Sequence, residues 1–411
     1  ANQATALNIN GSVNFGQRPF AYAAPSGFKA LCTTNLPDPT IADGSDYFDT
    51  KLWTGTGSSR SITGYNFSPD FVWIKKRSGS TSHNLFDIVR GANKPLFSDQ
   101  NIAELSDGRL TAFNSDGFTL DSDNAVNDNN ETHVGWAWDA GANSNKTYAV
   151  KVVSDSGNKY RFDDFGTSAV TLDLAEGSTY IFDQSDSSNS GHPLRFSTTS
   201  NGTHGGGTEY TTGVTVTGTP GQAGAKTTIV VAASAPTLYY YCSVHSGMGG
   251  QANTNSTAGA SNFDGSVQAT VKASQTAGFS IVNFNSQSSN ANYTCGHGLS
   301  AAPELIFMKS RTRSGGPWWT FHASVCDTVA KTLFLNTSGA VSDNVAAGGG
   351  NVWGAALPTN SVFGFTTGSG SAHTQNETVI AYCFTSVAGY SAIGSYTGNS
   401  SADGAFVYTG F

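Results

Sequence analysis

The sequence predicts an all-β fold made of several small β-sandwich modules in tandem. Its apolar runs are short, several of them alternate with polar residues, and Gly, Asn, Asp or Pro separates one run from the next. Only 12% of the residues are charged, 48 are glycine, and no long stretch has the 3.6-residue period of an amphipathic helix. Because 411 residues are too many for one hydrophobic core, we expect roughly two to four domains.

The composition argues against two classes of partner. The formal net charge is −8 and the longest basic run is Lys75 to Arg77, so no basic stripe is available to neutralise the phosphates of a nucleic acid. No apolar stretch approaches the roughly 18 residues of a membrane helix, and Ala1 to Asn10 lack the pattern of a signal peptide. We therefore expect neither nucleic-acid binding nor membrane insertion.

Several sequence blocks occur twice in the same order, which predicts a repeated module. The matching blocks are residues 64–77 with 298–311, 94–99 with 331–336, and 130–138 with 376–384. The start of the second copy, Gly278 to Val282, recurs at Gly389 to Ile393, so we expect a third copy to begin at 389. Each copy has the strand and turn pattern of a β-sandwich of about 100 to 120 residues.

The clearest local prediction is a hairpin in the first copy. Asn114 to Gly117 stand between Phe113 and Phe118. The Asp-Gly pair in this turn tolerates positive φ, which tight hairpin turns require. We therefore expect the segments on either side to pair as antiparallel strands.

A different pattern fills the space between the two copies. Residues 146–253 contain short apolar runs separated by turn residues, which predict a separate sandwich. The runs are residues 148–153, 170–174, 179–182, 194–196, 227–231 and 238–241. Residues 254–269, rich in Asn, Ser, Thr, Ala and Gly, are predicted to be a linker to the second copy.

One constellation in the middle module could carry chemistry. His192 opens a predicted strand, and Cys242 closes another, followed by His245 and Met248. Two imidazoles, a thiolate and a thioether can form a trigonal His₂Cys site with a weak axial Met, which suits copper in electron transfer. The alternative is that Cys242 is a small buried residue below an aromatic strand, with His245 and Met248 filling a loop.

The surroundings of these residues resemble those of small blue copper proteins, the plastocyanins and amicyanins. Leu238 to Gly250 resembles their ligand loop, and Gly191 to Phe196 resembles the strand of their first ligand. The resemblance covers about residues 146–253 and implies a cupredoxin-like Greek-key sandwich. It also implies a copper ligand set, namely His192, Cys242, His245 and Met248.

Two features depart from that family. The residue after the first His is commonly Asn there, and its backbone N–H helps to hold the Cys sulfur, whereas Pro193 has no N–H. A Gly-rich insertion, residues 201–207, carries His204 and is unlike the compact copper carriers. Both features argue against reading the site as a standard copper centre.

Two further resemblances concern the rest of the chain. Residues 13–31 look like the last strands of a SPRY domain, which implies that residues 1–45 are the C-terminal remnant of a concanavalin-like sandwich whose body precedes Ala1. The repeated module is similar to a domain of unknown function in virion and tail-fibre-like proteins of marine bacteriophages. The resulting plan is 1–45 SPRY-like, 46–145 first copy, 146–253 cupredoxin-like, 254–269 linker, 270–388 second copy, and 389–411 the start of a third.

The phage resemblance implies a non-enzymatic structural or adhesive protein, such as a tail fibre or other appendage, on the virion surface. Its expected partners are copies of itself in a homo-oligomer, other virion proteins, and a host-surface receptor or glycan. The chain has no Gly-x-Ser-x-Gly elbow, no His-Glu-x-x-His and no phosphate-binding Gly loop, so we expect no enzyme. The alternative function is a redox-active surface protein with a type 1-like copper site in the middle module.

Trp318 and Trp319 offer a last, weaker signal. Adjacent exposed aromatics can form a platform for sugar rings. The residues that follow, Thr320 and Phe321, continue a strand-like run. We therefore expect the two tryptophans to pack in a core.

Overall fold

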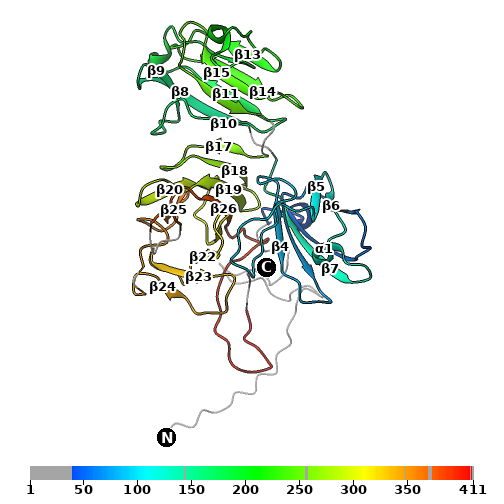
Figure 1. The fold of residues 1–411 in the computed structure, drawn as a ribbon. Coiled ribbons are helices and arrows are strands. Elements are labelled where there is room, and N and C mark those ends of the chain that lie inside the picture. Colours follow the sequence, from blue (N-terminus) through cyan, green and yellow to red (C-terminus); the bar gives the residue numbers. More distant parts are fainter. Residues whose placement is uncertain are drawn as a thin grey trace, which may run out of the picture.

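The computed structural model describes residues 39–142, 145–254, 258–347, 349–368, 373–407 and 409. Within these residues the protein is almost entirely β, as the sequence predicts, and its one α-helix is the short α1 (Asn124–Asn127). The strands form an N-terminal, a middle and a C-terminal module (Figure 1). No helix in the described ranges is long and apolar enough to span a bilayer. The SPRY-like segment predicted at the N-terminus lies almost wholly outside the described residues.

The N-terminal module follows a short 3₁₀ turn, η2 (Gly44–Asp46), and packs two sheets on a core that includes Trp53, Val72 and Phe118. One sheet has the order β1-β7-β3-β4 and the other β2-β6-β5. The bounds are β1 (Phe48–Thr54), β2 (Arg60–Thr63), β3 (Phe71–Lys76), β4 (Asn84–Asp87), β5 (Leu110–Asn114), β6 (Gly117–Leu120) and β7 (Thr132–Trp138). The predicted hairpin is confirmed, because β5 pairs with β6 through Asn114 and Gly117.

The middle module also packs two sheets on one core, which is rich in aromatic side chains. One sheet has the order β13-β14-β11-β8-β9 and the other β10-β16-β15-β12. The bounds are β8 (Lys146–Ser154), β9 (Asn158–Phe162), β10 (Leu172–Asp173), β11 (Thr179–Asp183), η3 (Ser187–Asn189), β12 (Leu194–Ser197), η4 (Gly202–Gly205), β13 (Val214–Thr217), β14 (Lys226–Val230), β15 (Leu238–Cys242) and β16 (Gly250–Asn253). Strands β8 and β11 are parallel, as are β10 and β16, and the other pairs are antiparallel.

The C-terminal module is built on a large sheet with the order β17-β18-β19-β26-β21-β22-β23-β24. A two-stranded sheet, β20-β25, contributes to the same core. The bounds are β17 (Ala260–Asn262), β18 (Ala269–Ser274), β19 (Phe279–Asn285), β20 (Asn292–Gly296), β21 (Leu305–Ser310), β22 (Trp319–His322), β23 (Lys331–Phe334), β24 (Ser342–Asp343), β25 (Val362–Thr366) and β26 (Thr378–Phe384). In Figure 1 the middle module lies above β17 and β18.

The repeated blocks occupy equivalent strands with the same register. In each copy a central strand pairs with two neighbours, β7 with β1 and β3, and β26 with β19 and β21. The matching cross-strand triplets are Phe48, Trp138 and Phe71 in one copy and Phe279, Phe384 and Leu305 in the other. The sequence repeat therefore corresponds to a repeated strand arrangement.

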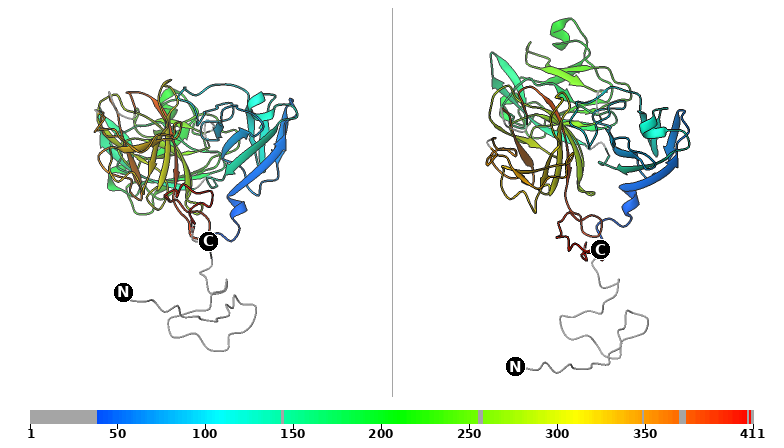
Figure 2. Two further views of the ribbon diagram at one scale, coloured as in Figure 1. Left: turned by 90° about the horizontal axis from the view of Figure 1, so that it is seen from below. Right: turned by 60° about the horizontal axis from the view of Figure 1, so that its bottom comes forward.

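The N-terminal and C-terminal modules pack against each other through these equivalent sheets. Phe71 stacks on Tyr382, with ring centroids 4.3 Å apart, in a cluster of buried residues from both modules. Trp138 contacts Phe384, the residue at the equivalent position of the second copy, with ring centroids 6.4 Å apart. A contact between equivalent residues indicates an approximate twofold relation between the copies. The two modules lie side by side in both views of Figure 2.

Two predictions about the chain outside the modules have different outcomes. The linker prediction for residues 254–269 is wrong over β17, which pairs with β18 and whose Ser261 is fully buried. Backbone hydrogen bonding rather than apolar side chains defines this strand, so the composition gave no sign of it. The third copy stays a prediction: from 389 to 407 the described residues carry an isolated bridge, Val387 with Ser391, and no strand.

Candidate metal centre

The structure brings together three of the four predicted ligands at one end of the middle module. Strands β12 and β15 are antiparallel neighbours, and Leu194 pairs with Cys242. His192, two residues before β12, therefore lies beside the end of β15, where Cys242 and then His245 follow. The potential ligand atoms of the three side chains all lie within 4.8 Å of one another.

The spacing of the donor atoms fits a metal ion. Cys242 Sγ lies 3.9 Å from His192 Nδ1 and 3.7 Å from His245 Nδ1. With metal–sulfur and metal–nitrogen bonds of about 2.3 and 2.0 Å and trigonal angles, the two kinds of donor lie about 3.7 Å apart. A set of one thiolate and two imidazoles at this spacing suits copper or zinc, and the trigonal His₂Cys arrangement favours copper.

The protonation of His192 also suits a ligand. Burial, and then the neighbouring His245, lower the pKa of His192 below its ordinary value. An imidazole must be neutral at the coordinating nitrogen to bind a metal, so a lowered pKa reduces competition from protons. His192 is half-buried, Cys242 is fully buried and His245 is exposed. The cluster thus reaches from the core to the surface.

The Cys242 sulfur has a backbone donor despite Pro193. The N–H of His245 donates to Sγ at 3.4 Å. Pro193 has no N–H to give, but its carbonyl accepts from the N–H of Ser243 at 3.1 Å and so ties the two strand ends together. Although Pro193 cannot donate to the sulfur, the N–H of His245, in the loop after Cys242, does so.

Hydrogen bonds also fix the backbone of His192. Its carbonyl accepts from Tyr160 Oη and from Gln184 Nε2, both at 2.8 Å. Gln184 Oε1 in turn accepts from the N–H of Leu194 at 3.0 Å. Such outer hydrogen bonds restrict how far a ligand can move and help to define the geometry of a metal site.

The Gly-rich insertion contacts the ligand loop directly. Asn201 Oδ1 accepts from the N–H of Gly247 at 2.7 Å, and His204 Nε2 lies 3.0 Å from the carbonyl oxygen of Cys242. Sequence reasoning singled out this segment as an anomaly and missed its role. Its only sequence signal was its place between two strands that carry ligands.

The remaining predicted residues lie as follows. Met248 is buried in the core of the middle module, where its carbonyl accepts from the N–H of Tyr160 at 3.0 Å, and its role as a ligand stays a prediction. Trp318 and Trp319 are buried, so the expectation of core packing is confirmed. The other described cysteines, Cys295, Cys326 and Cys383, are buried thiols in the C-terminal module.

Comparison with known proteins identifies one family. A family model described as "Domain of unknown function (DUF7483)" matches residues 43–163 and 252–411. The residues between these segments, which hold His192, Cys242 and His245, are not matched. No curated protein and no solved structure matches the chain. Because the two segments cover more than half of the sequence, the chain belongs to the DUF7483 family.

Proposed function

We propose that the middle module binds one copper ion on His192, Cys242 and His245, with Met248 as a weak fourth ligand. The observation that carries this proposal is the spacing of the Cys242 sulfur from the two Nδ1 atoms, 3.9 and 3.7 Å. Copper bound there would supply one-electron redox chemistry. The chain would then be a redox-active surface protein.

The environment of the cluster supports this proposal. The buried thiol provides a soft ligand, His192 provides a neutral imidazole, and the exposed His245 connects the site with the surface. The two-sheet arrangement, with β8 and β11 parallel, is compatible with the proposed cupredoxin-like Greek-key fold. The insertion and the backbone donor to sulfur hold the loop that carries Cys242 and His245.

Titration of the purified chain with Cu(II) tests the proposal. We expect one copper per chain by metal analysis and an intense visible band, because a copper–thiolate bond absorbs strongly. Cys242→Ser should abolish the band, whereas Cys295→Ser, which alters a buried cysteine outside the cluster, should leave it intact. A folded chain that stays colourless, or that binds zinc and not copper, would contradict the proposal.

We also propose a role for the rest of the chain, as a structural or adhesive protein of a phage virion. The specific observation in favour is the interlocking of the two repeat copies through a common buried cluster, which gives a rigid body that suits a particle surface. In this role the chain is a tail fibre or other appendage, contacts copies of itself and other virion proteins, and meets a host-surface receptor or glycan. It has no enzymatic function.

Antibody labelling of purified particles tests this second proposal. We expect an antibody against the chain to label an external appendage in electron micrographs, and cross-linking of the purified chain to give a discrete homo-oligomer. Particles without the chain, or a chain that remains monomeric at micromolar concentration, would contradict it. The copper titration uses the isolated chain, so the two proposals can fail separately.

A further inference from the structure

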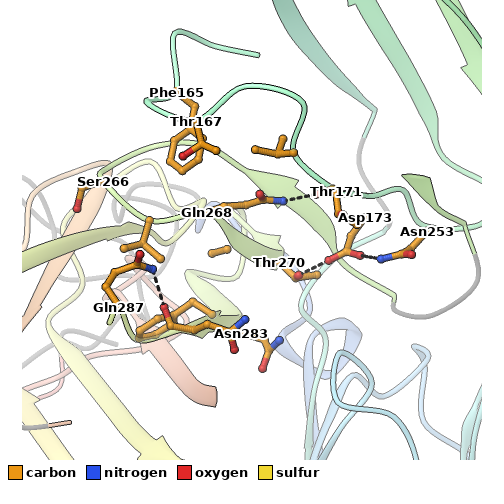
Figure 3. A pocket seen from close by; sticks show the side chains of 15 residues that line it. Phe165, Thr167, Thr171, Asp173, Asn253, Ser266, Gln268, Thr270, Asn283 and Gln287 are labelled. Atoms are coloured by element: carbon orange, nitrogen blue, oxygen red, sulfur yellow. Dashed lines mark hydrogen bonds between the residues drawn. The ribbon is translucent and has the colours of Figure 1, made fainter. Parts of the chain in front are cut away.

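A cavity of about 430 Å³ lies at the junction of the middle and C-terminal modules. On one side its walls come from β10, the loop before β10 and the end of β16. On the other side they come from β18 with the loop before it, and from β19 with the loop after it. Figure 3 shows side chains from both modules facing this space, among them Phe165, Gln268 and Gln287. Its volume is within the range of small-ligand sites, about 300 to 1,000 Å³.

The lining is polar but almost uncharged. Among the described residues that line the cavity there is no lysine or arginine, and the one carboxylate is Asp173. Carboxamides are the commonest polar groups, contributed by Asn253, Gln268, Asn283, Asn285 and Gln287. A carboxamide both donates and accepts hydrogen bonds, as the hydroxyl groups of a sugar do. The half-buried ring of Phe165 adds an apolar surface on which the face of a sugar ring can pack.

Hydrogen bonds within and between the modules hold the cavity in shape. Asp173 accepts from Thr270 Oγ1 of the C-terminal module and from Asn253 Nδ2 of its own module. Gln268 Nε2 donates to the carbonyl of Thr171 at 2.7 Å, and these bonds appear as dashed lines in Figure 3. Because the two walls are already joined, a ligand would not have to order them when it binds.

We propose that this cavity binds a neutral saccharide of roughly one or two rings. The absence of cationic groups in the described lining, together with Asp173, disfavours phosphate, sulfate and carboxylate ligands. The excess of carboxamide groups disfavours an apolar ligand, because desolvating them without new hydrogen bonds is costly. The inference rests on the proposed adhesive role and names the chemical class of the host-surface ligand.

A glycan array probed with the full purified chain tests the inference. We expect binding to uncharged glycans, confirmed by calorimetry with the free saccharide that gives the strongest signal. Gln287→Ala should weaken that binding at least about tenfold, because it removes a hydrogen-bonding group from the cavity. Gln275→Ala is the matched control, since Gln275 lines a separate cavity and is not among the residues that line this one.

Three outcomes would overturn the inference. The array could show no binding, it could show binding only to sialylated or sulfated glycans, or Gln275→Ala rather than Gln287→Ala could abolish binding. Circular dichroism of both variants distinguishes loss of the site from loss of the fold. Failure here leaves the antibody labelling of particles unaffected, so the adhesive role and its ligand class are tested separately.

Discussion

Asp70 and Asp139 lie next to each other where β3 begins and β7 ends, and Lys272 of the C-terminal module lies beside them. Asp70 is 3% exposed, and its Oδ2 is 3.4 Å from Lys272 Nζ. Burial raises the pKa of Asp70 to about 7; Lys272 opposes this shift, and Asp139 adds to it. The carboxyl group thus holds its proton to a higher pH in the folded chain than in the unfolded one.

The raised pKa predicts how the stability depends on pH. Between about pH 4 and 7 the folded chain binds more protons at Asp70 than the unfolded chain, so the free energy of unfolding falls as the pH rises. We expect this contribution to be on the order of 2 to 4 kcal/mol and to disappear in Asp70→Asn. Denaturant unfolding of the parent chain and of Asp70→Asn from pH 4.5 to 8 measures this pH-dependent part of the free energy of unfolding. Parallel stability curves for the two proteins would contradict the assignment to Asp70.

At the scale of single elements, the insertion that contains η4 packs against the loop after Cys242, which carries His245, and hydrogen-bonds to it. Gly202 has a φ of +56°, and a Cβ there would lie 2.4 Å from the ring of Tyr241, so the segment packs tightly against the residue before Cys242. Asn201 has a φ of 61° and bonds Gly247 through its side chain. The insertion therefore restricts the loop that carries His245.

Removal of the Asn201 side chain should loosen that loop. Asn201→Gly keeps a residue that tolerates positive φ but deletes the acceptor for the N–H of Gly247. We expect copper affinity to fall roughly 3- to 10-fold, with a shift of the visible band, since outer hydrogen bonds set ligand geometry. Thr203→Ala, an exposed position in the same turn, is the control and should change neither. An unchanged band and affinity in Asn201→Gly would show that the insertion does not restrain the site.

The sequence predicts those elements whose causes are local. The β5–β6 hairpin follows from the Asp-Gly turn, and the register of the repeat follows from aromatic residues at matching positions. The cluster of His192, Cys242 and His245 could be predicted because each residue stands at a strand end or within three residues of one. The contact of His204 could not, because its partner is the carbonyl of Cys242, which is distant in the sequence. Strand β17 pairs with the nearby β18, but its Ala-Ser-Asn sequence lacks the apolar alternation that predicts a strand.

At the scale of the whole molecule, the N-terminal and C-terminal modules share buried charges as well as a core. Arg90 is fully buried and contacts Asp87 and Glu104 of its own module and the Tyr382 hydroxyl of the other. Burial opposes the ionisation of Glu104, but the hydrogen bond from Arg311 and the charge of Arg90 outweigh it and lower its pKa. A network that joins both modules in this way favours their unfolding as one unit.

The core of the middle module is distinct from the buried cluster that joins the other two modules, although Phe263, just after β17, also packs into it. The stability of the middle module should therefore respond to copper separately. Scanning calorimetry of the metal-free chain should show two transitions, one for the middle module and one for the paired modules. Copper at about 100 times its dissociation constant adds about 2.7 kcal/mol to the free energy of unfolding of the binding module, which raises the temperature of that transition by on the order of 10 °C.

Tyr382→Phe removes a buried hydroxyl that donates to Asp87. It should therefore lower the temperature of the transition of the paired modules by several degrees and leave the copper-sensitive transition in place. A single transition that moves as a whole with copper would show that the three modules unfold together. A Tyr382→Phe variant that lowers both transitions equally would contradict the independence of the middle module.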